Sequence, residues 1–138
     1  MVDSFSMNGY HAYRQTQAQT AAPGELVVML YRGAVRFASA AADAMDTRDV
    51  QGAHNNLVRA QAIINELSET LDLERGGDIA RNLLAIYDYM RRRLIDANLK
   101  KDPAPAREVV QLLRELLPAW EQIARGAATP APALVGAA

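Results

Sequence analysis

Two stretches in the middle of the chain carry apolar residues at alternating steps of three and four. The first contains Leu57, Ala60, Ile64, Leu67 and Leu71, and the second contains Ile79, Leu83, Ile86, Met90, Leu94 and Ala97. This spacing places one apolar stripe along an α-helix. Gly76 and Gly77 separate the two stretches, and glycine accepts the left-handed geometry of a helix end. The pattern predicts a helical hairpin whose stripe residues lie in a core.

The same periodicity predicts one further helix on each side of this hairpin. Pro23 and Glu25 suit the first turn of a helix, because proline needs no amide partner there and glutamate complements the helix dipole. Asp78 is expected to cap the third helix. The expected helices span about 23–45, 50–71, 78–100 and 106–125. Short connections between four such helices predict an all-α fold, an antiparallel up-down four-helix bundle with a short N-terminal segment or helix packed on it.

The sequence divides into a bundle domain, residues 23–125, and two flanking segments. Residues 1–22 are small and polar apart from a few large side chains, among them Tyr10 and Tyr13. Two rings three residues apart share one side of a short helix, so this segment is either a frayed tail or a cap docked by its rings. Residues 126–138 are rich in alanine, proline and glycine, a composition that predicts disorder.

Composition narrows the class of protein. Half of the 138 residues are hydrophobic, enough for a real core, and a net charge of −1 gives no reason to expect nucleic acid as a partner. The chain has no cysteine and therefore no disulfide framework. No apolar run approaches the roughly 20 residues of a membrane span, and the N-terminus lacks the pattern of a secretory signal. The absence of cysteine fits a reducing cytoplasm without establishing it, and we expect no membrane insertion.

Residues with catalytic or metal-binding chemistry are scarce. A bundle can hold a di-metal site built from Glu-x-x-His pairs, but neither His11 nor His54 follows a glutamate at that distance. Gly76-Gly77-Asp78 lacks the lysine and hydroxyl residue of a phosphate-binding loop and is better explained as a helix cap. The sequence predicts no enzyme, no cofactor and no metal.

Two of the expected helices carry more apolar residues than one stripe needs. Leu84, Tyr87 and Ile95 lie beside the stripe of the third helix, and Val27 and Tyr31 lie beside that of the first. One explanation is a wider core, because bundles use three or four apolar positions in two turns. The other is a groove that receives an amphipathic helix of a partner.

Several motifs, in order, are less generic than the stripes. They are the Tyr10 and Tyr13 segment, Leu26-Val27-Val28-Met29-Leu30-Tyr31-Arg32-Gly33, the turn from Leu71 to Asp78, the stretch from Asn82 to Tyr89, Arg92 to Asn98, and Trp120 in the last helix. Their order and spacing resemble the FliS family, the flagellin-specific export chaperones of bacterial flagella. The chain departs from the family pattern at Ala22, at Arg32 and at Pro118.

The resemblance implies a chaperone of the bacterial cytosol rather than an enzyme. It implies binding to the disordered C-terminal region of flagellin, which prevents premature polymerisation, and delivery to the flagellar export apparatus, with an export-gate component as a second partner. The N-terminal segment then acts as a displaceable cover. The client-binding residues expected on this basis are Tyr10, Tyr13, Val27, Leu30, Tyr31, Ala34, Leu84 and Tyr87. The alternative is a helical adaptor or regulatory protein that self-associates through an apolar groove.

Overall fold

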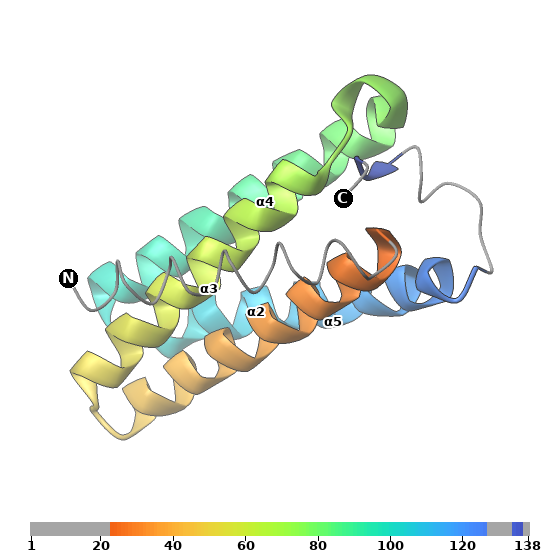
Figure 1. The fold of residues 1–138 in the computed structure, drawn as a ribbon. Helices are drawn as coiled ribbons and strands as arrows, with labels where there is room; N and C mark the ends of the chain where they lie inside the picture. Colours follow the sequence, from red (N-terminus) through yellow and green to blue (C-terminus); the bar gives the residue numbers. More distant parts are fainter. Residues whose placement is uncertain (1–22, 127–133, 137–138) are drawn as a thin grey trace.

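The computed structural model describes residues 23–126 and 134–136, and four long helices make up most of this part (Figure 1). They are α2 (Pro23–Asp46), α3 (Val50–Thr70), α4 (Leu73–Lys100) and α5 (Pro103–Ala124). Helix α2 packs against α3 and α5, and α4 packs against the same two helices from the other side. Successive helices run in opposite directions (Figure 1). The predicted all-α antiparallel bundle is confirmed; the proposed packing of residues 1–22 on it lies outside the described residues.

Aspartate side chains cap the N-termini of the last three helices. Each accepts a hydrogen bond from a backbone amide of the first turn, which satisfies one of the amides that a helix start leaves without a partner. The bonds join Gly52 N to Asp49 (2.9 Å), Arg75 N to Asp72 (3.0 Å) and Ala104 N to Asp102 (3.0 Å). Each aspartate cap therefore fixes the residue at which its helix begins.

The beginning of α4 differs from the prediction. The helix starts at Leu73 and is capped by Asp72, whereas Asp78 forms an ion pair with Arg81. Gly77 interrupts the helix with φ 57° and ψ −136°. A side chain is strained at that φ, which explains a glycine at this position. One helical turn begun by Asp72 precedes this break and the long part of α4 follows it, so the break lies where the glycines predict it, and a cap at Asp78 stays a prediction.

The buried stripe of α4 is also rotated relative to the predicted one. It consists of Ala80, Leu83, Tyr87, Met90, Leu94 and Ala97, at strict steps of three and four. The prediction preferred the larger aliphatic residues Ile79 and Ile86, but Ile79 is 58% exposed and Ile86 is only partly buried. The small Ala80 and the hydrogen-bonded Tyr87 occupy the core instead. The other core residues predicted for the hairpin, Leu57, Ile64, Leu67, Leu83 and Met90, are buried as expected.

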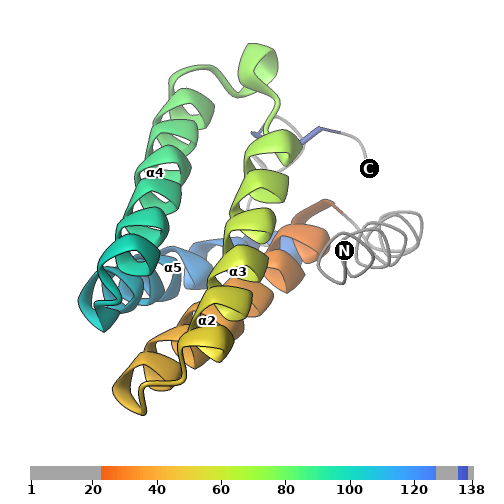
Figure 2. The ribbon, with the colours of Figure 1, turned by 90° about the vertical axis from the view of Figure 1, so that its left-hand side faces the viewer.

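The C-terminal segment differs from the prediction as well. Leu134 and Val135 are buried, and Val135 forms an isolated antiparallel bridge with Leu71 beside the connection between α3 and α4 (Figure 2). The prediction of disorder from residue 126 onward is therefore wrong for residues 134–136. Composition predicted disorder because alanine and proline dominate the segment. The packing is decided instead by its few large apolar side chains, Leu134 and Val135.

Candidate functional site

An apolar groove runs between α4 and α5. Its volume is about 420 Å³, and its lining is Ala85, Ile86, Tyr89, Leu112 and Leu116, with Glu108 and Glu115. Of these apolar side chains, Ile86, Leu112 and Leu116 are half-buried, whereas Ala85 and Tyr89 are exposed. The two helices thus leave apolar surface open to solvent along their shared edge.

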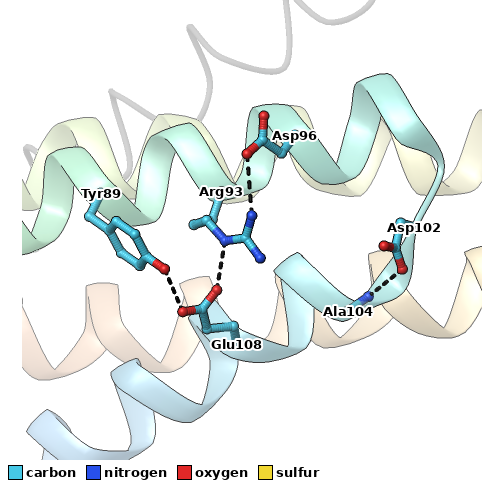
Figure 3. A network of polar contacts seen from close by, with 6 residues as sticks. All are labelled: Tyr89, Arg93, Asp96, Asp102, Ala104 and Glu108. Atoms are coloured by element: carbon cyan, nitrogen blue, oxygen red, sulfur yellow. Dashed lines mark hydrogen bonds and ion pairs between the residues drawn. The ribbon is translucent and has the colours of Figure 1, made fainter.

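A polar network joins α4 to α5 beside this groove (Figure 3). The carboxylate of Glu108 accepts a hydrogen bond from the Tyr89 hydroxyl (2.5 Å) and another from Arg93 Nε (2.6 Å). Arg93 also donates to Asp96 (3.3 Å). These bonds, first from Tyr89 and then from Arg93, lower the pKa of Glu108. The network therefore keeps Glu108 ionised and fixes the Tyr89 ring at the edge of the groove.

Inside the bundle, three aromatic side chains connect α2, α4 and α5. The hydroxyls of Tyr31 and Tyr87 are 2.7 Å apart, and Trp120 Nε1 donates to the Tyr31 oxygen at 3.1 Å. The two tyrosine rings meet edge to face, with centroids 6.2 Å apart. Burial raises the pKa of Tyr31 to about 12 and also raises the pKa of Tyr87. Both tyrosines are therefore neutral and hydrogen-bonded in the core.

The residues expected to bind a client occupy different environments. Val27, Leu30, Tyr31, Ala34 and Tyr87 are each at most 3% exposed and belong to the core. Leu84 is half-buried, but at two positions from Ile86 it lies on the opposite flank of α4 from the groove. Tyr10 and Tyr13 lie outside the described residues. The burial is what a wider core predicts, and client contact at these positions stays a prediction.

The sequence did not single out the groove itself. Ile86 was assigned to a core stripe, and Tyr89, Leu112 and Leu116 are not among the expected client-binding residues. A usable signal was present, because Leu112 and Leu116 are four residues apart and Ile86 and Tyr89 are three apart, so each pair follows one flank of its helix. The distance between the two helices, which decides whether these flanks close over each other, is not encoded in either pattern alone.

The described residues contain neither a metal-binding cluster nor a membrane-spanning helix. No group of three or more histidine, cysteine, aspartate or glutamate side chains in this part of the chain is arranged to hold a metal ion. Within the same residues, none of the helices has the length and apolar character needed to cross a bilayer. The groove has half-buried and exposed apolar side chains along its length, which fits a binding surface.

Comparison with known proteins finds a single family along the chain. The family model described as flagellar protein FliS matches residues 6–127, which include all four helices. The flagellar secretion chaperone FliS of Bacillus subtilis (strain 168) is 42% identical over 83% of this chain and 85% of its own length. The protein of that name from Salmonella typhimurium is 39% identical, over 86% and 92% respectively. Flagellar secretion chaperone FliSB of Pseudomonas aeruginosa is 33% identical, over 86% and 98%.

Proposed function

This chain belongs to the FliS family of flagellar secretion chaperones, and on that premise we propose that its client is the disordered C-terminal region of flagellin. Binding keeps flagellin from polymerising prematurely and aids its transfer to the flagellar export apparatus, where an export-gate component is a second proposed partner. The proposed place of action is the bacterial cytosol. The observation that carries the proposal is similarity to proteins named secretion chaperones along nearly the whole chain.

The groove between α4 and α5 supports this function with a suitable surface. Apolar side chains line it and Glu115 is exposed at its side, so it fits an amphipathic helix whose apolar face is flanked by lysine or arginine. A client that is disordered when free must order its backbone as it binds, which takes back about 2–5 kcal/mol of the interaction free energy. Such coupled folding allows a specific complex that still releases its client without ATP.

The proposal also keeps the contacts inferred from the family resemblance. Tyr10 and Tyr13 are proposed to hold the N-terminal segment over the client surface as a displaceable cover. Contact with Val27, Leu30 or Ala34 requires that covering residues move, since these side chains are buried in the free protein. In hydrogen exchange, deletion of residues 1–18 should expose amides near Tyr31. Random-coil exchange of amides 10–15 in the intact protein would contradict the docked cover.

We expect a groove variant to lose client. Ile86→Asp places a carboxylate in the apolar lining, which should weaken binding of a flagellin C-terminal peptide by at least about tenfold, because a charge buried without a partner is costly. The matched control is Ile79→Asp, an exposed position on the same helix that does not line the groove. Binding is measured by calorimetry, and gain of helix in the peptide by far-UV circular dichroism.

The outcome separates the proposal from its alternative. Equal affinity in both variants would remove the groove from the client site, and no helix gain with the wild-type protein would refute the flagellin proposal itself. Sedimentation of the protein without peptide completes the test. Self-association that Ile86→Asp abolishes, together with absent peptide binding, would favour the helical adaptor instead.

A further inference from the structure

The C-terminal residues that the structure describes are held at the connection between α3 and α4 (Figure 1). The amide of Asp72 donates to the carbonyl of Leu134 at 2.8 Å, and the amide of Gly136 donates to the carbonyl of Thr70, also at 2.8 Å. These bonds flank the antiparallel bridge between Leu71 and Val135. Leu134 is 7% exposed and Val135 is 3% exposed, so both apolar side chains are buried.

The connection between α3 and α4 leaves backbone groups that an extended segment can pair with. Leu71 is extended, with φ −72° and ψ 136°, and it separates the helical ladders of α3 and α4. The carbonyl of Thr70 and the amide of Asp72 are consequently available for main-chain pairing. The side chain of Asp72 is already engaged in capping α4. Pairing at such an edge recognises backbone groups, and pockets for side chains add the preference for apolar residues.

We propose that the edge formed by residues 70–72, with the apolar seat filled by Leu134 and Val135, is a docking site for an extended apolar segment of the client, and that the C-terminal residues occupy it in the free protein. The inference rests on the proposed function, because a disordered flagellin C-terminal region brings the same chemistry, namely unpaired backbone groups and apolar side chains. The chain's own C-terminal segment shows what the site accepts.

The contact is suited to exchange. Over the described residues, one bridge and two backbone hydrogen bonds join the segment to the edge. Pro130 and Pro132 precede it in the sequence, and proline has no amide to donate to a ladder. Because the segment belongs to the same chain, it binds the site intramolecularly, at a high effective concentration. A client must therefore compete with the segment. The client's apparent affinity is its intrinsic affinity multiplied by the fraction of time that the site is open.

The test compares three forms of the full chain. One is wild type, one carries Leu134→Ser and Val135→Ser, and the control carries Gln122→Ser at an exposed position of α5. If the segment covers the site about nine-tenths of the time, the double variant should bind a flagellin C-terminal peptide roughly tenfold more tightly than wild type and the control. Unfolding in urea checks that all three proteins fold.

Hydrogen exchange of the wild-type complex gives a second measurement that needs no variant. When the peptide replaces the segment, the Gly136 amide should lose its protection, whereas the Asp72 amide should keep it by donating to the peptide. Two outcomes overturn the inference: wild type binds peptide but the double variant binds equally or more weakly, or Gly136 stays protected in the complex. Residues 134–136 would then only stabilise the connection between α3 and α4. If no form binds peptide, the proposed function fails, and this inference fails with it.

Discussion

At the scale of single residues, Tyr31 links three helices, because its hydroxyl on α2 hydrogen-bonds to side chains of α4 and α5. Its hydroxyl bonds to both Trp120 and Tyr87, so Tyr31→Phe leaves two buried groups without their partner. We expect a loss of about 1–3 kcal/mol in the free energy of unfolding. Tyr87→Phe should cost less, about 1 kcal/mol, because Tyr31 then keeps its bond from Trp120. Urea unfolding measures both.

A third tyrosine variant provides the control for this comparison. Tyr89→Phe, on the same helix as Tyr87, removes only an exposed bond to Glu108 and should change the free energy of unfolding by less than about 0.5 kcal/mol. Equal losses for the three variants would show that the buried network has no special role in stability. A change in the denaturant slope would instead indicate that the variant alters the compactness of one state.

The raised pKa values of the two buried tyrosines make stability depend on alkaline pH. An unfolded tyrosine has a pKa of about 10, whereas burial raises the pKa of Tyr31 to about 12. Below pH 10 both states keep the proton and the contribution is complete. As pH rises from about 10 towards about 12, the unfolded state ionises first, and stability falls by about 1.4 kcal/mol per pH unit for each such tyrosine. Burial raises the pKa of Tyr87 as well, which adds a loss of the same sign.

The measurement is urea unfolding at several values between about pH 8 and about pH 11, with the Tyr31→Phe, Tyr87→Phe double variant as reference. The double variant has no buried phenol, so its stability should fall less steeply above pH 10. Parallel curves for the two proteins would mean that both tyrosines ionise in the folded state as they do in the unfolded chain.

At the scale of elements, two glycines of α2 mark different kinds of helix contact. A Cβ at Gly24 would lie 3.2 Å from the backbone Cα of Ala124 on α5, whereas a Cβ at Gly33 would lie 3.1 Å from Cδ1 of Ile63 on α3. Backbone cannot yield but the end of a side chain can. Gly24→Ala should therefore cost about 1–3 kcal/mol through overpacking. At Gly33→Ala the gain in helix propensity, about 1 kcal/mol, should offset the small clash.

Thermal or urea unfolding of these two variants tests how tightly α2 packs at each contact. A neutral Gly24→Ala would show that α2 and α5 can separate there without cost. A glycine within a helix costs about 1 kcal/mol relative to alanine, and a close approach of another backbone is one explanation for it at Gly33. The structure places a side chain of α3 against it instead.

The helices themselves were predictable because their signals are local. Period, caps and glycine breaks lie within a few residues of each other, so the number and order of the four helices and most of their ends follow from the pattern. The phase of α4 did not, because Ile79 is more hydrophobic than Ala80 but Ala80 fits the space between helices. The family motifs predicted the kind of protein. The groove was not predicted, since it depends on the spacing of α4 and α5.

At the scale of the whole molecule, the helices are not held equally. Helix α2 packs extensively against α3 and α5, whereas α4 makes fewer contacts with the same two neighbours. Helix α4 also contains the break at Gly77 and exposes Ile79, Tyr89 and Ile95. Its ion pairs within the helix, such as Arg92 to Asp88, involve exposed side chains and contribute about 0–1 kcal/mol each. The helix that lines the groove thus combines a backbone break, exposed apolar side chains and fewer close backbone approaches to its neighbours than α2.

This unevenness predicts where the molecule opens. In native-state hydrogen exchange, amides in the first half of α4, about residues 79–89, should exchange faster than those of α2, because this half follows the break at Gly77 and exposes Ile79 and Tyr89. Addition of a flagellin C-terminal peptide should slow exchange in this half of α4 more than in α2, since a ligand stabilises the segment that it covers. The Ile86→Asp variant supplies the control, because it should exchange in the same order without the slowing. Uniform protection of all four helices in the free protein would contradict the predicted opening of α4, and slowing confined to α2 and α3 on addition of peptide would place the client on the other side of the bundle.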